Sequence, residues 1–263
     1  MQIFDGRAEA KKLDQKISEF VTKNPTKKQL AIVQIGDNES SEKYVNIKQQ
    51  LGKKLGIDVV LHKLEASLGD PELVAAARAV FNDEEVGGVI VQLPLPRGEL
   101  NVILDKIPPE KDIDALSDRI VTGYEGRHSP VVRSAEHFIY SMGNDSGQKK
   151  AIIVGGGKLV GKPVAEYLEK RDWQVEIDEN YTRGKSLEAQ LVVLSVGVAN
   201  LVSGEDISDG AGVIDFGSSV VDGKVVGDLD MNTSLDHLGL VSPSPGGMGP
   251  LTVRYLFLNF LGI

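Results

Sequence analysis

The 263-residue chain contains no cysteine. This absence excludes disulfide bonds, thiolate zinc sites, iron–sulfur clusters and a cysteine nucleophile. Any chemistry must therefore come from oxygen and nitrogen groups or from a bound cofactor. The four histidines show no metal-ligand spacing, so we expect no metal site; they are His62, His128, His137 and His237.

Basic residues are fewer than acidic ones, with 29 Lys and Arg against 38 Asp and Glu and a net charge of −9. This balance gives no broad basic surface for a phosphate backbone, so nucleic acid is not an expected partner. Apolar runs such as Val86–Leu95 are shorter than the roughly 20 residues of a membrane helix. The first ten residues lack the apolar core of a signal peptide. We expect a cytoplasmic protein that binds small molecules and no membrane.

Short β-branched runs alternate with helical patterns along the chain, which is typical of an α/β fold with mostly parallel sheets. The expected strands are Leu30–Ile35, Val59–Lys63, Gly88–Gln92, Lys150–Val154, Gln174–Asp178, Leu191–Ser195 and Gly212–Asp215. The expected helices are Arg7–Val21, Ser41–Leu55, Pro71–Phe81, Ser134–Tyr140 and Lys162–Lys170.

A polar stretch, Gly143–Lys150, suggests a domain boundary, because it precedes a new strand, glycine turn and helix. Residues 1–143 would form one lobe and residues 144–245 the other. The last apolar pattern lies within residues 246–263 and follows a Pro/Gly segment, Ser242–Pro250. It predicts a short helix that must cover a groove.

The glycine turn after the strand Lys150–Val154 is typical of dinucleotide-binding folds. Gly155, Gly157 and Gly161 have the spacing GxGxxxG, which lets a turn approach a pyrophosphate at a helix N-terminus. Asp178 ends the next strand, near the position at which an acid accepts the ribose hydroxyls of NAD and repels the extra phosphate of NADP. Glu179 competes for that role. The alternative is a purely structural turn with an acid at a strand end.

Two segments of the first lobe carry a candidate active site. Tyr44 and Lys48 are four residues apart, so a helix places them on one face. Gln92 ends a buried strand, where ligands of open parallel sheets bind. The structural alternatives are a helix with a half-buried tyrosine and a lysine reaching solvent, and a glutamine that caps its strand.

The segment Pro108–Asp114 has two alternating acids, Asp112 and Asp114, after two prolines. A solvated turn is one interpretation. The other is a carboxylate that accepts two parallel N–H bonds from a ring edge such as that of a pterin. Asp114 is the better candidate of the two.

Together these motifs resemble the methylenetetrahydrofolate dehydrogenase/methenyltetrahydrofolate cyclohydrolase family over nearly the whole chain. The order and number of the motifs carry the resemblance, rather than any single one. They are Ile3–Gly6, Ser41 with Tyr44–Lys48, Gly88–Pro96, Lys111–Asp114, Val160–Pro163, Gly223–Asp228 and Pro243–Thr252.

The resemblance implies a two-lobed enzyme with an N-terminal folate-binding catalytic domain and a Rossmann-like dinucleotide-binding domain. It also implies that the helix in residues 246–263 returns to the first lobe and that the protein is a homodimer. In such enzymes the lysine matching Lys48 assists hydrolysis, with Tyr44 and Gln92 beside it. The implied folate-binding residues are Tyr44, Ser41, Gln92, Asp114, Pro245, Gly246 and Gly247. The implied cofactor-binding residues are Gly155, Gly156, Gly157, Gly161, Asp178, Glu179 and Ser218.

The chain departs from the family pattern at three places. Gly155–Gly157 replaces a usual Gly-Arg-Ser, and Asp178–Tyr181 replaces a Cys-His-Ser-type segment. Both replaced elements normally serve the phosphate of NADP, so NAD is the expected cofactor and NADP is disfavoured. Pro130–Arg133 replaces a Pro-Cys-Thr-Pro loop beside the cleft, and Ala115 stands where glycine is common.

The first functional prediction is an enzyme that oxidises methylenetetrahydrofolate with NAD and hydrolyses the methenyl product. A positively charged substrate beside a sequestered lysine disfavours the ammonium form, so we expect Lys48 to act as a neutral amine. One alternative is a cyclohydrolase that has lost hydride transfer. Another is a non-catalytic folate- or nucleotide-binding relative, for which the lysine has no evident use.

Overall fold

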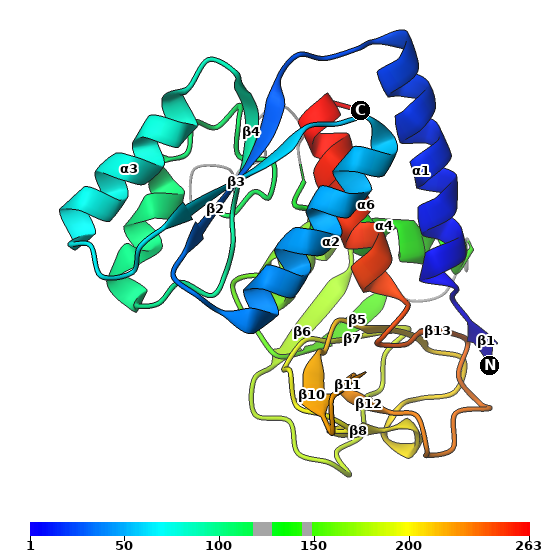
Figure 1. The fold of residues 1–263 in the computed structure, drawn as a ribbon. Coiled ribbons are helices and arrows are strands. Elements are labelled where there is room, and N and C mark those ends of the chain that lie inside the picture. The colour runs from blue at the N-terminus through cyan, green and yellow to red at the C-terminus, as the bar shows by residue number, and fades with distance from the viewer. Residues whose placement is uncertain (118–127, 144–148) are drawn as a thin grey trace. The chain divides into compact units, whose positions relative to one another are not determined.

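The computed structural model describes residues 1–117, 128–143 and 149–263 (Figure 1). Its internal contacts divide the chain into two compact units. The large-sheet unit comprises Met1–Lys11 and Val131–Tyr255, and the small-sheet unit comprises Lys12–Pro130 and Leu256–Ile263. Each unit contains a parallel sheet, which confirms the predicted α/β fold.

The small-sheet unit has a three-stranded parallel sheet in the order β3-β2-β4. Helix α2 contacts β3, and α3 contacts all three strands; Figure 1 shows the two helices on opposite sides of the sheet. The elements are α1 (Gly6–Lys23), which belongs to this unit from Lys12 onward, β2 (Gln29–Ile35), α2 (Glu39–Leu55), β3 (Val59–Leu64), α3 (Asp70–Asn82), β4 (Val86–Val91) and the 3-10 helix η1 (Gly98–Lys106).

Strands β2 and β4 of this sheet are mostly buried, as their continuous apolar runs predict, whereas β3 is mostly half-buried. Ala31, Val33 and Ile35 of β2 pack in a cluster with Leu73 and Phe81 of α3. The intervening residues of β2 are also buried. A parallel sheet covered on both faces leaves only its strand ends open to ligands, and Gln92 follows one of these ends.

The large-sheet unit has a six-stranded sheet, all of whose strand pairs are parallel, in the order β1-β13-β9-β7-β5-β6. Two smaller pairs accompany it, β10 with β11 and β12 with β8. The strands of the sheet are β1 (Gln2–Ile3), β5 (Lys150–Val154), β6 (Gln174–Asp178), β7 (Leu191–Leu194), β9 (Gly212–Asp215) and β13 (Leu240–Ser242). The other elements are α4 (Pro130–Ser141), α5 (Gly161–Glu169), β8 (Val202–Ser203), η3 (Gly204–Asp206), β10 (Ser219–Val221), β11 (Lys224–Val226), β12 (Leu229–Asp230) and α6 (Met248–Leu261).

The division into units differs from the predicted boundary at residue 143. After residue 12, the next boundary between the two units falls between Pro130 and Val131. Residues 144–148, at the predicted boundary, lie outside the described residues. The first residues join the large-sheet unit because β1 pairs with β13. Residues 246–255 also belong to that unit, and only the end of α6, from Leu256, groups with Lys12–Pro130.

Pro130–Arg133 is not a loop, which corrects the expectation from the family pattern. These residues form the first turn of α4. Proline suits that position because its fixed φ is helical and the first turn needs no N–H donor. Arg133 then lies over the ring of Tyr255, with its guanidinium carbon 4.7 Å from the ring centroid.

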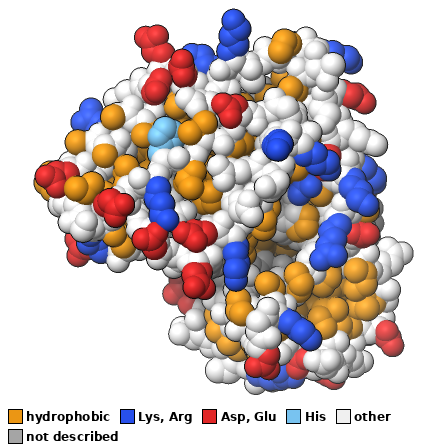
Figure 2. Space-filling view, viewed as in Figure 1, with side chains coloured by type: hydrophobic (Ala, Val, Ile, Leu, Met, Phe, Trp, Pro, Cys, Tyr) orange, Lys and Arg blue, Asp and Glu red, His pale blue; other side chains and the backbone are white. Residues whose placement is uncertain are grey.

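Among the helices that the structure describes, none combines the length and apolar character needed to span a membrane. Within the same described ranges, no group of three or more His, Asp or Glu side chains could hold a metal ion. Figure 2 shows acidic and basic side chains interspersed over the visible face.

Candidate active site

Helix α2 carries the predicted pair of Tyr44 and Lys48. The helix begins after Asn38, whose side-chain oxygen accepts a hydrogen bond from the backbone N–H of Ser41, and this cap holds the first turn. The side chain of Lys48 is turned inward, since the residue is only 7% exposed. Its Nζ donates to Oε1 of Gln92 at 2.8 Å. The structure therefore brings the predicted lysine and the predicted strand-end amide together.

Leu93 fixes the orientation of the Gln92 amide. Nε2 of Gln92 donates to the carbonyl oxygen of Leu93 at 2.7 Å, so Oε1 faces Lys48. The hydroxyl of Ser41 donates to the same carbonyl at 3.3 Å. Ser41, Lys48 and Gln92 thus form one connected polar cluster, and all three are buried.

Tyr44 lies at the edge of this cluster. Nζ of Lys48 is 6.0 Å from the centroid of the Tyr44 ring, and the tyrosine is 45% exposed. An aromatic ring with one exposed face can stack on a planar ligand while its other side borders the amine. The spacing of four residues placed the two side chains as expected.

The charge of Lys48 is weakened by its surroundings. Burial lowers the pKa of Lys48, and the negative charge of Asp114 opposes this by raising it. Burial also raises the pKa of Asp114 to about 6, with the charge of Lys48 lowering it and that of Asp112 raising it further. The cluster is therefore an amine of reduced basicity near an acid of reduced acidity, a combination typical of catalytic sites.

The segment of Asp114 is held beside β4. Val89 of β4 forms a parallel bridge with Asp112, whose carboxylate accepts from the backbone N–H of Ser117 at 2.9 Å. Asp112 thus positions the segment. Ala115 has a φ of +56°, a left-handed conformation that costs a non-glycine residue about 1 kcal/mol. This conformation is a physical reason for glycine to be common at that position in the family pattern.

The glycine turn of the large-sheet unit is closely packed. A Cβ on Gly161 would lie 1.9 Å from the carbonyl oxygen of Gly155, and Gly155 itself has a φ of +96°. At Gly157, in contrast, a Cβ would meet nothing within 4 Å. The turn therefore needs glycine where helix α5 meets it and leaves open space at Gly157, which a phosphate-bearing ligand could approach.

The two acids at the end of β6, Asp178 and Glu179, have different partners. Asp178 is 8% exposed, and its carboxylate accepts from Nζ of Lys185 at 2.6 Å and from the backbone N–H of Asn180 at 3.1 Å. Glu179 is exposed, and its Oε1 would be 2.7 Å from a Cβ on Gly156. The structure thus places Glu179 against the glycine turn, while Asp178 serves its own loop.

The remaining predicted residues also belong to the large-sheet unit. Ser218 is exposed between β9 and β10, beyond the carboxyl end of β9. Gly247 donates its backbone N–H to Pro243, and a Cβ on Gly6 would lie 1.8 Å from the carbonyl oxygen of Gly247. The loop Pro245–Gly247 therefore packs against the Ile3–Gly6 motif, a contact that sequence spacing could not indicate.

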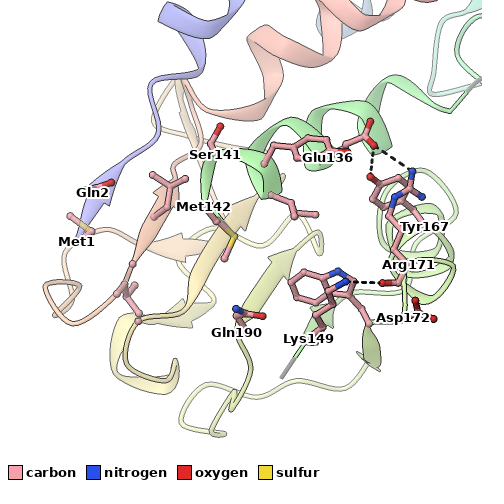
Figure 3. Close-up of a pocket in the computed structure, with 18 of the residues that line it drawn as sticks. Met1, Gln2, Glu136, Ser141, Met142, Lys149, Tyr167, Arg171, Asp172 and Gln190 are labelled. Carbon is pink, nitrogen blue, oxygen red and sulfur yellow. Dashed lines mark hydrogen bonds and ion pairs between the residues drawn. The ribbon is translucent and has the colours of Figure 1, made fainter. Parts of the chain in front are cut away.

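A pocket of about 790 Å³ lies in the large-sheet unit, near residues that precede β5, β7 and β9 (Figure 3). Its polar groups bind one another: the hydroxyl of Tyr167 donates to Glu136 at 2.6 Å, and the guanidinium carbon of Arg171 is 3.7 Å from the centroid of the Tyr167 ring. None of the predicted site residues lines it. Ligands of open parallel sheets bind at the opposite, carboxyl ends of the strands, where the glycine turn lies.

A parallel sheet with a glycine turn, together with a separate unit that buries a lysine against an amide, defines a two-unit α/β protein of the nucleotide-binding class. The chain matches the family descriptions "Tetrahydrofolate dehydrogenase/cyclohydrolase, catalytic domain" over residues 4–114 and "Tetrahydrofolate dehydrogenase/cyclohydrolase, NAD(P)-binding domain" over residues 131–263. The chain therefore belongs to the tetrahydrofolate dehydrogenase/cyclohydrolase family of enzymes, and the resemblance noted from its motifs is confirmed.

Relatives and solved structures agree with this assignment. The bifunctional protein FolD of Clostridium acetobutylicum is 34% identical over 98% of this chain and 97% of its own length. The crystal structure of the bifunctional enzyme FolD from Campylobacter jejuni has a TM-score of 0.88 and 28% identity, covering 100% of this chain and 98% of the other. The Trypanosoma brucei enzyme, solved with NADP and an inhibitor, has a TM-score of 0.86 and 26% identity, covering 98% of this chain and 95% of the other.

Proposed function

We propose that this enzyme oxidises 5,10-methylenetetrahydrofolate to the methenyl compound with a nicotinamide dinucleotide and hydrolyses that compound to 10-formyltetrahydrofolate. Family membership and the FolD relatives support the pair of reactions. The observation that carries the proposal is the buried hydrogen bond between Nζ of Lys48 and Oε1 of Gln92. This contact places an amine of lowered pKa beside a neutral acceptor.

Hydrolysis of the methenyl compound needs a group that accepts a proton from the attacking water. A neutral Lys48 amine can accept that proton at Nζ while one of its N–H groups stays bonded to Gln92. An amide partner holds the amine without adding the negative charge that would favour the ammonium. The positive charge of the methenyl substrate lowers the lysine pKa further, so proton acceptance is most favourable when substrate is bound.

Asp114 is the proposed group for the pterin. Its carboxyl group lies close enough to Lys48 for their charges to affect each other's pKa. A carboxylate can accept two parallel N–H bonds from a pterin edge, which fixes the ring plane. Ser41 and Tyr44 would border the same ligand.

The glycine turn of the large-sheet unit fits a dinucleotide. The open space at Gly157 and the tight contact of Gly161 with Gly155 suit a pyrophosphate at the start of α5. A bound nicotinamide supplies the hydride acceptor. The turn, together with Gly156 and Ser218, would orient the dinucleotide.

We further propose that NAD is preferred over NADP. The turn Gly155–Gly157 carries no arginine for a 2′-phosphate, and the exposed carboxylate of Glu179 lies against Gly156. Negative charge at this place favours ribose hydroxyls over a phosphate. The nearby ammonium of Lys185 is already paired with Asp178. Glu179, rather than Asp178, is therefore the proposed ribose-binding acid.

The test is a spectrophotometric assay of the purified protein with methylenetetrahydrofolate and each dinucleotide. The proposal expects reduction of NAD to be much faster than reduction of NADP, followed by hydrolysis of the methenyl product. Equal or reversed preference would defeat the assignment to Glu179. Hydrolysis without reduction of either dinucleotide would instead identify a cyclohydrolase that has lost hydride transfer.

The proposed assembly is a homodimer. The hairpin β10–β11 supports it, because Val220 is 74% exposed and Val221 and Val225 are also exposed. Apolar side chains clustered on a surface hairpin favour contact with another protein surface. Light scattering should report a dimer whose monomer fraction rises in Val220→Asp but not in the matched exposed variant Val102→Asp; a monomeric wild-type protein would contradict the proposal.

A further inference from the structure

Two acids of the large-sheet unit are buried at the carboxyl edge of its sheet. Asp215 is the last residue of β9, and Asp228 directly precedes β12. Their exposed fractions are 2% and 0%. Burial raises the pKa of Asp215 to about 7 although three backbone N–H bonds favour its ionised form, and the charge of Asp228 adds to the rise. Burying two carboxyl groups so close together costs folding free energy. We therefore expect their negative charge to have a function that neutral residues could not provide.

Asp228 binds three successive backbone N–H groups of the loop after β7. It accepts from Val196 at 2.7 Å, from Gly197 at 3.0 and 3.1 Å, and from Val198 at 2.8 Å. Successive N–H groups that converge in this way form an anion-binding concavity. Here an internal carboxylate occupies it, so the backbone conformation of the loop depends on the negative charge of Asp228.

Asp215 in turn fixes Asp228. Its carboxylate accepts from the backbone N–H groups of Asp228 at 3.2 Å, Leu229 at 3.0 Å and Gly217 at 2.8 Å. Two glycines make room for the pair: a Cβ on Gly227 would lie 2.0 Å from Oδ2 of Asp215, and one on Gly217 would lie 2.2 Å from Oδ1 of Asp228. Asp215 thus packs against Gly227, the neighbour of Asp228 in the sequence. Asp228 packs against Gly217, which lies two residues after Asp215.

The loop that Asp228 holds also contacts the glycine turn. The hydroxyl of Ser195 donates to the carbonyl oxygen of Gly155 at 2.8 Å, and a Cβ on Gly155 would be 3.1 Å from a methyl group of Val196. Both segments follow neighbouring strands, β5 and β7, at the edge where parallel sheets bind ligands.

We propose that Asp228, supported by Asp215, is a positioning residue for the dinucleotide: its charge sets the loop Val196–Val198 in the conformation that completes the cofactor site beside the glycine turn. This inference rests on the proposed dinucleotide binding. It assigns a function to the acid of the Gly223–Asp228 motif, which the Lys48 chemistry leaves unused.

The experiment compares wild type, Asp228→Asn and the surface control Asp209→Asn by calorimetric titration with NAD and by both enzyme assays. An asparagine keeps the shape but replaces one acceptor oxygen with an N–H₂ donor facing the loop N–H groups. We expect the dissociation constant and the KM for NAD to rise roughly tenfold or more, because charged hydrogen bonds are lost. The hydrolysis rate of the methenyl compound should not change, since Lys48 belongs to the other unit.

The outcomes separate the two proposals. If wild type binds neither NAD nor NADP, the proposed dinucleotide function fails and this inference fails with it. If wild type binds NAD and Asp228→Asn binds it equally well, only the inference is overturned. Should thermal melting show that Asp228→Asn is unfolded, Asp215→Asn decides: a smaller rise in the KM for NAD with unchanged hydrolysis supports the inference, and an unchanged KM overturns it.

Discussion

Lys48 of the small-sheet unit and Asp178 of the large-sheet unit are both buried charged side chains, but they contact different kinds of partner. Lys48 meets the neutral amide of Gln92, whereas Asp178 meets the ammonium of Lys185 and a backbone N–H. Burial therefore lowers the pKa of Lys48, with the charge of Asp114 opposing the shift. The carboxylate of Asp178, in contrast, has an ammonium group 2.6 Å away.

This contrast separates a reactive group from a structural one. A neutral partner orients an amine without stabilising its charged form. An opposite charge holds both side chains in their charged forms and ties them to one geometry. Glu179, the acid that we propose for the ribose of a dinucleotide, is exposed and lies against Gly156.

The largest effect is expected from replacing Lys48, the buried side chain whose partner is neutral. Lys48→Met should lower the rate of methenyl hydrolysis by about a hundredfold or more, because a general base is lost. Folate binding measured by calorimetry should persist. The control is Lys43→Met, which removes an exposed lysine from the same helix. Unimpaired hydrolysis in Lys48→Met would show that Lys48 is not the group that accepts the proton from water.

A second, smaller effect is expected from removing the charge of Asp114, which raises the pKa of Lys48. Asp114→Asn should raise the KM for the folate about tenfold, since charged hydrogen bonds to the pterin become neutral ones. If Lys48 is the proton acceptor, the rate of hydrolysis should rise with pH as Lys48 loses its proton. Because Asp114 raises the lysine pKa, its removal should move the midpoint of the kcat profile to lower pH. A midpoint that stays in place or moves upward would contradict the electrostatic coupling.

Dinucleotide preference gives the next effect in size. Glu179→Gln removes a charge beside the glycine turn and should tighten NADP binding by about three- to tenfold, with a smaller change for NAD. Calorimetric titration with both dinucleotides measures this. The matched control is Glu176→Gln, which changes an exposed acid on β6, the strand that Glu179 follows. Equal responses of the two variants would show that overall charge, rather than the position of Glu179, sets the preference.

The smallest effect on binding is expected for Asp178→Asn. Because Asp178 is paired with Lys185, the ratio of NAD to NADP affinity should change by no more than about twofold. The melting temperature should fall, since the ammonium and the N–H of Asn180 lose their shared carboxylate. A large change in preference with an unchanged melting temperature would restore Asp178 as the ribose-binding acid.

The sequence predicted the parts of the fold that depend on local pattern. The seven expected strands are present as β2 to β7 and β9. Runs rich in β-branched residues favour strands without reference to distant residues, whether the strand is buried, as β7 is, or mostly exposed, as β6 is. The pair Tyr44 and Lys48 followed from helical spacing, and Gln92 from the end of a strand. Pro130–Arg133 was misplaced because the family pattern outweighed the local preference of proline for a first helical turn.

Contacts between distant segments could not be predicted. Met1–Lys11 joins the large-sheet unit because β1 pairs with β13, more than 200 residues away. Neither strand has a sequence pattern that indicates which strand it pairs with. Asp178 is bonded to Lys185, and Asp228 is bonded to a loop some 30 residues earlier.

The amino-acid sequence by itself indicated seven of the strands, the main helices and the family to which the chain belongs. Only the tertiary structure decided which charged side chain meets a neutral partner and which meets an opposite charge. The reason is that secondary structure follows from the repeat of apolar residues along the chain, whereas the protonation and orientation of a buried group follow from neighbours that the chain brings together only when it folds.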